Sequence, residues 1–135
     1  MKLLDNKTAV ISGTNRGIGK STLELFAKNN CNIFACAREA SEEFSDFILS
    51  LSAEFNVVIE PVYFDFSNQN SIKDAAKTIL SKSQKIDIVI NNAGLAHGSL
   101  FQMLSYEKMY ELFNINFFAQ VQFTQLLVKN MIKNK

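Results

Sequence analysis

Short apolar runs alternate without a break with helix-like segments along this chain of 135 residues. The strand-like runs are 8–12, 32–37, 57–64 and 86–90. The helical segments run from Gly17 to about Asn30, from Ser41 to about Glu54, from Ser71 to about Lys82, and from about Ser105 into the C-terminal lysines. Ser41 is the expected N-cap of the second helix, and Ser71-Ile72-Lys73-Asp74 is the pattern of a capping box that opens the third. Short, almost wholly apolar strands joined by helices are typical of a parallel sheet that is covered on both faces. The pattern therefore predicts an α/β fold with a doubly wound parallel sheet.

Chain connectivity also predicts the order of the strands. Right-handed crossovers wind the first three strands outward as 3-2-1, and the fourth returns to the far side of the first. Pro61, inside the run 57–64, suits an edge strand because it has no N–H to donate. Ligands of such sheets bind beyond the carboxyl ends of the strands, where the order reverses. In the predicted order 3-2-1-4, that crevice receives residues 13–19 and 91–94.

The segment SGTNRGIGKST at 12–22 allows two interpretations, because glycine loops bind the phosphates of both triphosphates and dinucleotides. A P-loop needs four residues between its first glycine and the Gly-Lys pair, whereas five separate Gly13 from Gly19-Lys20. The later run 86–90 also ends in Asn91-Asn92 and not in an acid that could organise magnesium. The spacing G-x-x-x-G-x-G therefore favours a dinucleotide.

Composition excludes several other classes of function. With 14 basic and 13 acidic residues, the chain has no charge surplus for nucleic acid or an anionic membrane surface. It has no apolar run near the roughly 18 residues of a membrane span and no signal-peptide pattern, so we expect a cytoplasmic protein. Cys31 and Cys36 would lie about 16 Å apart on opposite faces of a strand, which predicts reduced thiols and no disulfide. His97 has no second ligand near it, so no metal site is expected.

These motifs together resemble the short-chain dehydrogenase/reductase family, over essentially the whole chain. The loop matches the family pattern TGxxxGIG through Gly13, Gly17, Ile18 and Gly19, with Ser12 in place of the usual threonine. The resemblance implies a Rossmann-type fold in which this loop, with its inner residues Asn15 and Arg16, binds a dinucleotide. It also implies that residues 1–135 form one domain, the N-terminal cofactor-binding portion of the family fold.

Further matches follow in the family's order. The resemblance assigns Asp65 to the adenine amino group, with Phe66 beside it, and matches the NNAG signature to Asn91, Asn92, Ala93 and Gly94. It places the family's structural and catalytic asparagine at Asn116. The bland alternatives are that Asp65 caps a helix, that 91–94 is an ordinary turn, and that Asn116 is a solvated helix residue. Four matches in the right order favour the family assignment.

The residues after the second strand bear on the choice of cofactor. An NAD site places an acid there for the ribose 2′-hydroxyl, while an NADP site places a cation. The sequence is Cys36-Ala37-Arg38, and Arg16 resembles the second basic residue of NADP-using relatives. NADP(H) is therefore the preferred cofactor. If Glu39 took the acid's role instead, the cofactor would be NAD(H).

The catalytic pair of the family is not found in this sequence. The family uses a tyrosine with a lysine four residues later, and none of Tyr63, Tyr106 and Tyr110 has that partner. We therefore expect a chain that carries the cofactor-binding half and Asn116, and that lacks the C-terminal catalytic half.

Two functions stay open at this point. The first is an NADP(H)-dependent oxidoreductase that moves a hydride between nicotinamide and an unknown small carbonyl or alcohol substrate. The second is a non-catalytic dinucleotide-binding or interaction module. The last helix is apolar almost all round, which predicts a second surface that covers it. The family resemblance implies a homo-oligomer formed through this helix, and the alternative is cover by a helix not in this chain.

Overall fold

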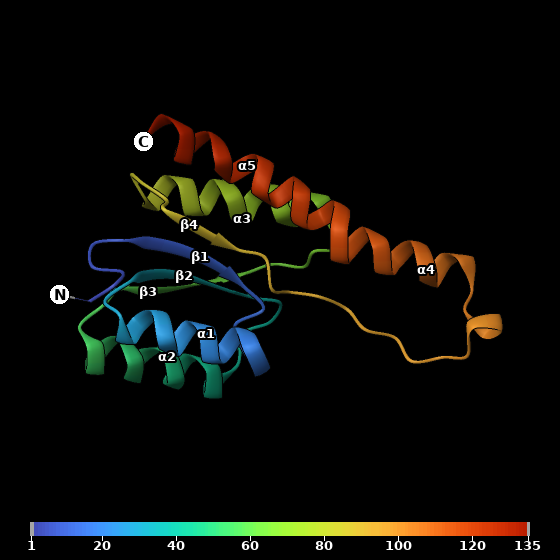
Figure 1. Ribbon diagram of the computed structural model, residues 1–135, viewed down its shortest axis with the longest axis horizontal. Coiled ribbons are helices and arrows are strands. Elements are labelled where there is room, and N and C mark those ends of the chain that lie inside the picture. The colour runs from blue at the N-terminus through green and yellow to red at the C-terminus, as the bar shows by residue number, and fades with distance from the viewer. Residues whose placement is uncertain (1, 135) are drawn as a thin grey trace.

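The computed structural model describes residues 2–134 as three layers, a parallel sheet between two layers of helices (Figure 1). The elements are β1 (Thr8–Ser12), α1 (Gly17–Lys28), β2 (Asn32–Ala37), α2 (Glu42–Phe55), β3 (Ile59–Tyr63), α3 (Gln69–Lys82), β4 (Ile88–Ile90), the 3₁₀ turn η1 (Phe101–Met103), α4 (Tyr106–Phe113), the π-helical segment η2 (Asn114–Phe118) and α5 (Ala119–Lys133). The strand order is β3-β2-β1-β4, which confirms the predicted order. Pro61 lies in β3 at one edge of the sheet, also as predicted.

The sheet has a separate hydrophobic core on each face. Alternate residues of one strand point to opposite faces, so Val10 packs in the core under α3 and α5, while Ala9 and Ile11 pack in the core under α1 and α2. Cys36 belongs to the first core and Cys31 to the second, and both thiols are free. The predicted placement of the cysteines on opposite faces is therefore confirmed.

The caps of two helices decide how the chain enters them. Ser41 caps α2 as predicted, because its side chain accepts a hydrogen bond from the N–H of Phe44 at 3.1 Å. The predicted capping box at Ser71 is wrong: Asn68 caps α3, accepting from the N–H groups of Asn70 (3.0 Å) and Ser71 (3.1 Å). The Ser71 hydroxyl instead accepts from the N–H of Asp65 at 3.1 Å. That bond holds the turn after β3 against α3.

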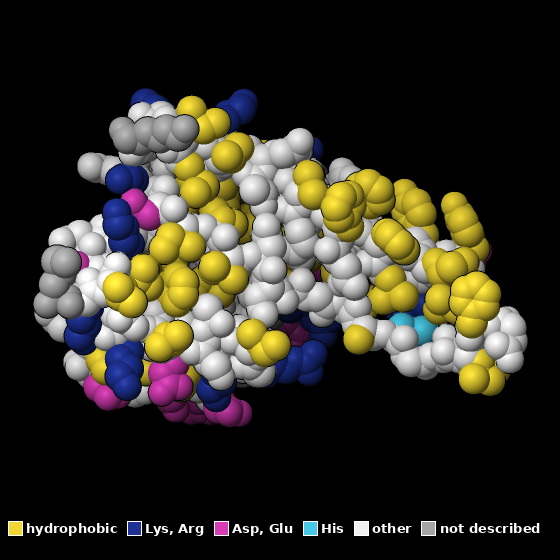
Figure 2. Space-filling model, in the orientation of Figure 1, with side chains coloured by type: hydrophobic (Ala, Val, Ile, Leu, Met, Phe, Trp, Pro, Cys, Tyr) yellow, Lys and Arg dark blue, Asp and Glu magenta, His cyan; other side chains and the backbone are white. Residues whose placement is uncertain are grey.

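The predicted long C-terminal helix is interrupted at its middle. After α4 the backbone widens into η2, where the N–H of Ala119 donates to the carbonyl of Asn114 five residues earlier. Figure 1 shows α5 lying beside α3 and the sheet, while α4 reaches beyond them. We call the part of the chain from η1 to η2, residues 101–118, the projecting arm. Figure 2 shows hydrophobic side chains gathered over this arm. The most exposed of them include Phe101, Tyr106, Tyr110, Phe113, Phe117 and Phe118.

Candidate functional site

A cleft of about 680 Å³ lies at the carboxyl ends of the strands. The segments that follow all four strands contribute to its lining. Eleven of the candidate cofactor residues named in the sequence analysis line it: Gly13, Asn15, Arg16, Gly17, Ile18, Arg38, Asp65, Phe66, Asn92, Ala93 and Gly94. The structure therefore brings together the glycine loop, the acid after β3 and the tail of β4, as the predicted switch point requires.

The glycine loop presents the N-terminus of α1 to this cleft. Gly13 and Gly17 have φ values of 69° and 54°, a region that glycine enters at little cost. Arg16, the residue before the helix, makes no side-chain cap. The N–H of Lys20 is the first in the helix that donates to a backbone carbonyl of the same turn, that of Arg16. The N–H groups before Lys20 therefore have no acceptor inside the helix. Together with the helix dipole, they favour an anion such as a pyrophosphate.

Gly19 acts through packing and does not line the cleft. A Cβ atom at this position would overlap the carbonyl oxygen of Gly13 and approach Nδ2 of Asn92 within 2.5 Å. A residue larger than glycine would therefore push the start of α1 away from the loop. Lys20 also lies outside the cleft lining: its Nζ is 4.5 Å from the ring centroid of Phe47 and 3.7 Å from a Glu43 oxygen, both on α2. A P-loop lysine would have to reach phosphates, so this placement supports the dinucleotide interpretation.

Small polar side chains fix the loop to its neighbours, and of these the sequence did not single out Thr14. Ser12 Oγ accepts from the backbone N–H groups of Asn92 and Ala93, each at 3.0 Å. The Asn92 amide in return donates to the carbonyls of Ser12 (3.1 Å) and Gly13 (3.2 Å). Thr14, fully buried, donates to the carbonyl of Cys36 through both N–H and hydroxyl. The ends of β1, β2 and β4 are thereby joined into one floor.

Asp65 and Phe66 form the wall that follows β3. The Asp65 carboxylate accepts from the N–H of Ser67 at 2.8 Å through Oδ1. Phe66 packs its ring against those of Phe64 and Phe123, with centroids 4.8 and 5.7 Å away. The carboxylate is thus held at the rim of the cleft on a rigid aromatic base, where it can accept a hydrogen bond from an amino group.

Two arginines line the cleft from neighbouring segments, Arg16 after β1 and Arg38 after β2. The Arg38 side chain is 70% exposed, and its Nε lies 3.7 Å from a Glu39 oxygen. An exposed pair at that distance contributes little to stability. Arg38 can therefore leave Glu39 for a ligand that carries more negative charge, such as a phosphate.

Asn91 and Asn116 lie outside the cleft lining. Asn91 donates through Nδ2 to the hydroxyl of Thr124 on α5 at 2.9 Å. Asn116, on η2, holds the backbone of Leu95: its Oδ1 accepts from the N–H at 2.7 Å, and its Nδ2 donates to the carbonyl at 2.8 Å. Leu95 itself lines the cleft. Asn116 therefore positions the cleft wall in this structure, and its catalytic role stays a prediction.

The two thiols are poor nucleophiles. Burial raises the pKa of Cys31 to about 11, and burial also raises the pKa of Cys36, which lines the cleft. The thiolate is the reactive form of cysteine, so both side chains stay protonated and inert near neutral pH. In residues 2–134, no three His, Cys, Asp or Glu side chains are grouped as a metal site would need. Nor is any helix of that range long and apolar enough to cross a membrane.

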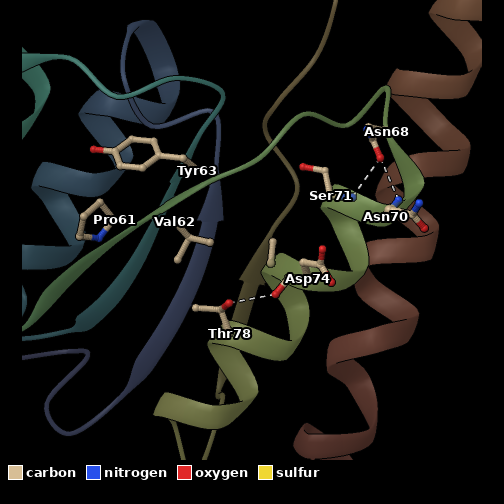
Figure 3. A pocket seen from close by; sticks show the side chains of 9 residues that line it. Pro61, Val62, Tyr63, Asn68, Asn70, Ser71, Asp74 and Thr78 are labelled. Atoms are coloured by element: carbon tan, nitrogen blue, oxygen red, sulfur yellow. Dashed lines mark hydrogen bonds between the residues drawn. The ribbon is translucent and has the colours of Figure 1, made fainter.

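A second hollow, of about 470 Å³, lies between β3 and α3 (Figure 3). Its polar lining groups are used locally: Asn68 caps α3, and the Thr78 hydroxyl donates to the carbonyl of Asp74 at 2.9 Å. It lies along the outer edge of the sheet, and none of the predicted site residues lines it. The cleft at the strand ends is therefore the candidate site.

Comparisons of the sequence with known proteins agree on one family. Residues 7–135 match the family model described as short chain dehydrogenase. A 7alpha-hydroxysteroid dehydrogenase of Paraclostridium sordellii is 31% identical over 140 residues, covering 100% of this chain and 51% of the relative. A 3-oxoacyl-(acyl-carrier-protein) reductase of Thermotoga maritima is 27% identical over 132 residues, covering 98% and 53%. The chain thus spans about half the length of the curated relatives it matches.

Solved structures show the same fold. The L-sorbose reductase of Gluconobacter frateurii, complexed with NADPH and L-sorbose, superposes with a TM-score of 0.90 at 27% identity, covering 97% of this chain and 49% of the other. An alcohol dehydrogenase of the archaeon Thermococcus sibiricus, complexed with 5-hydroxy-NADP, gives 0.84 at 25% identity, covering 92% and 52%. The fold of this chain is therefore shared with proteins that were solved in complex with NADPH and with 5-hydroxy-NADP.

Proposed function

Since this chain belongs to the short-chain dehydrogenase family, we propose that it carries the cofactor half of an NADP(H)-dependent oxidoreductase acting on a carbonyl or alcohol substrate. The observation that supports this most is the convergence of an uncapped helix N-terminus, two arginines and a rim carboxylate on one cleft. Each group suits a different part of the same ligand. The named activities of the relatives, which are dehydrogenases and reductases, favour this reading over a non-catalytic binding module.

The cleft fits the dinucleotide part by part. The free N–H groups before Lys20 would bind the pyrophosphate. Asp65 would accept from the adenine amino group, with Phe66 supporting the wall behind it. The nicotinamide end would then lie toward Ala93 and Gly94. When bound, the cofactor would supply or accept the hydride, while the residues of this chain bind and orient it.

NADP(H) is proposed as the preferred cofactor, with NAD(H) as the weaker ligand. Arg16 and Arg38 line the same cleft, and arginine can hold a 2′-phosphate through two parallel hydrogen bonds. The L-sorbose reductase that superposes on this chain is a complex with NADPH. The opposing group is Glu39, whose carboxylate would favour the 2′-hydroxyl of NAD(H) if Arg38 stayed paired with it.

The acid–base step calls for a tyrosine–lysine pair, which these 135 residues do not contain. Reduction of a carbonyl leaves an alkoxide that must receive a proton, and none of the three tyrosines has a lysine four residues later. Asn116 would support the step by holding Leu95 and the cleft wall. We propose that the 135 residues bind cofactor and that turnover depends on a tyrosine–lysine pair supplied by further chain.

We also propose that the projecting arm is a subunit interface between copies of the protein. Phe113, Phe117 and Phe118 are 67%, 56% and 57% exposed on neighbouring turns of α4 and η2. Single exposed apolar residues are ordinary, but a contiguous aromatic surface is a common mark of an interface. Figure 2 shows hydrophobic side chains gathered at many points along the arm.

The free thiols support a cytoplasmic location, which is the last part of the proposal. Both cysteines are buried and unpaired. Reduced thiols of this kind suit a compartment kept reducing by the cell. Fractionation of cells that express the tagged protein would test the location directly.

The substitution Gly17→Asp tests the cofactor site. A Cβ atom at Gly17 meets nothing within 4 Å, so the new carboxylate would stand in the open cleft at the helix N-terminus. The φ of 54° at Gly17 strains any L-residue, but Asp is among the residues that tolerate this region best, and an acid there favours the helix dipole. The fold should therefore survive, while the carboxylate repels the pyrophosphate. Calorimetry should show NADPH binding to the native chain and its loss in the variant.

Gly17→Asn is the control for backbone strain, because it places an uncharged side chain of the same size at the φ of 54°, and it should bind NADPH better than Gly17→Asp. Gly98→Asp is the control for the added charge. A Cβ atom at Gly98 also meets nothing within 4 Å, and Gly98 does not line the cleft. The control adds the same charge to the chain, so it should keep native affinity for NADPH. Equal binding by native protein and Gly17→Asp would refute the site.

A further inference from the structure

The chain that leaves β4 is fastened to the C-terminal helix by three side chains placed one helical turn apart. Asn91 donates to the hydroxyl of Thr124, the carbonyl of Ala93 accepts from Gln120, and Leu95 is held by Asn116. Each step advances two residues along the tail and four residues back along the helix. We infer that these contacts form a register ladder, and that Gln120 is the positioning residue that aligns the cleft wall with η2.

The spacing of the ladder follows from the rise per residue of its two segments, the tail after β4 and the C-terminal helix. A nearly extended chain advances about 6.6 Å over two residues. An α-helix advances about 6 Å over four residues. Because the two rises are nearly equal, tail residues 91, 93 and 95 can each meet one turn of the antiparallel helix. A slip by one residue would turn Ala93 and Leu95 away from it.

Gln120 makes the central rung, and the π-helical segment explains why an amide is needed there. In a regular α-helix the N–H of Ala119 would donate to the carbonyl of Ile115, but here it donates to Asn114. Gln120 Nε2 supplies the missing donor to Ile115 at 3.2 Å and donates to Ala93 at 3.1 Å. One amide group thus joins the widened turn of the helix to the tail of β4.

The burial of Gln120 supports this role. The residue is 6% exposed, and its Oε1 is buried without a partner among the described residues. A buried acceptor without a donor is costly, and an apolar side chain of the same size would avoid that cost. The donor half of the amide is therefore the useful half. Since both of its acceptors are carbonyls, the orientation of the amide is fixed by chemistry.

The ladder adds to the proposed function, and only its predicted effect on NADPH binding depends on that function being right. Ala93, Leu95 and Ile115 line the cleft, so a loosened central rung should weaken NADPH binding. The register itself can be measured without cofactor. Amide hydrogen exchange of Leu95, whose N–H donates to Asn116, reports on the rung next to Gln120, and exchange of Val10 in the core of β1 reports on the whole fold.

Gln120→Met in the full chain is the decisive variant, because it keeps the size of the side chain and removes the donor. Leu95 should exchange at least about ten-fold faster, as expected for the loss of one or two hydrogen bonds, while Val10 is unchanged. An unchanged Leu95 would overturn the inference, since packing alone would then suffice. An equal rise at Leu95 and Val10 would also overturn it, because Gln120 would then support the fold as a whole.

Gln120→Glu tests whether a donor at this position restores the protection of Leu95 when the new side chain is protonated. The ionised carboxylate has no donor for the carbonyls of Ala93 and Ile115, whereas the protonated acid has one. The exchange protection of Leu95 should therefore rise in this variant as pH falls, and it should stay flat in Gln120→Met. A flat profile in Gln120→Glu would contradict the donor role. If the native chain failed to bind NADPH, the proposed function would fail, but these exchange results would still decide the ladder.

Discussion

Ser12→Ala is the substitution for which the structure gives the clearest magnitude. The Ser12 side chain is buried, and its hydroxyl accepts from two backbone N–H groups, those of Asn92 and Ala93. The variant leaves both donors without that acceptor in a partly buried site. Each buried donor left unsatisfied costs about 1–3 kcal/mol, and access from the cleft favours the lower part of this range. We expect a loss of about 2–3 kcal/mol in the free energy of unfolding.

Thr14→Val provides the contrast that tests this reasoning. The hydroxyl of Thr14 donates to the carbonyl of Cys36, but the backbone N–H of Thr14 also donates to it at 3.1 Å. Removal of the hydroxyl therefore leaves no orphaned group, and the loss should be only about 1 kcal/mol. Ser12→Thr keeps the hydroxyl and should stay closer to the native protein than Ser12→Ala does.

The assay is urea unfolding at one fixed protein concentration, since association would change the apparent stability. Small domains have only about 5–15 kcal/mol of stability in all, so the expected difference is readily measured. If Ser12→Ala were no more destabilising than Thr14→Val, the orphaned-donor argument would be refuted.

Three further predictions concern charge and association. Arg38→Ala should weaken NADPH binding about ten-fold or more and leave NADH binding nearly unchanged, as calorimetry can show; an unaltered ratio would mean that Arg38 does not bind the 2′-phosphate. Although burial opposes it, hydrogen bonds from Thr8 and Lys85 lower the pKa of Asp87, so its stabilisation should be present above about pH 3.9 and be lost as pH falls through and below that value; Asp87→Asn should lack this part of the acid sensitivity in unfolding measurements. Phe113→Lys should shift the chain toward monomer in light scattering, whereas Leu49→Lys, at an equally exposed site on α2, should not.

The sequence predicted two strands well, and in these the backbone N–H and C=O groups form the hydrogen bonds of the sheet. The runs 8–12 and 32–37 match β1 and β2 to the residue. The other two strands begin two residues later than predicted, where side chains accept from N–H groups, and β3 also ends one residue earlier, at Tyr63. The N–H of Val58 donates to the side chain of Asn32, and that of Ile86 to the side chain of Asn130 on α5. Apolar patterning cannot reveal such competition, since it records burial and not the partner of each N–H.

The cap of α3 shows a different limit. Asn68 and Ser71 are both good N-cap residues, and the Ser-x-x-Asp spacing favoured the second. Asn68 caps the helix, because the hydroxyl of Ser71 already accepts a hydrogen bond from the N–H of Asp65 after β3. This contact belongs to the tertiary structure, so a local pattern could not weigh it.

Sequence reasoning found the residues that face the cleft and missed those that hold them in place. Gly13, Asp65 and Gly94 could be found because a ligand motif has a fixed spacing. Thr14 and Gln120 carry no such signal, since each acts on backbone groups brought near only by the fold.

Asn116 falls between these two classes. The family pattern predicted it as catalytic, yet both polar atoms of its side chain are engaged by Leu95. Each of these atoms makes only one of the two hydrogen bonds open to it, since Nδ2 carries a second N–H and Oδ1 a second lone pair. Asn116 is also exposed, so it can hold Leu95 and still offer a donor and an acceptor to a ligand. The positioning role of Asn116 is therefore compatible with the predicted catalytic role, which stays a prediction.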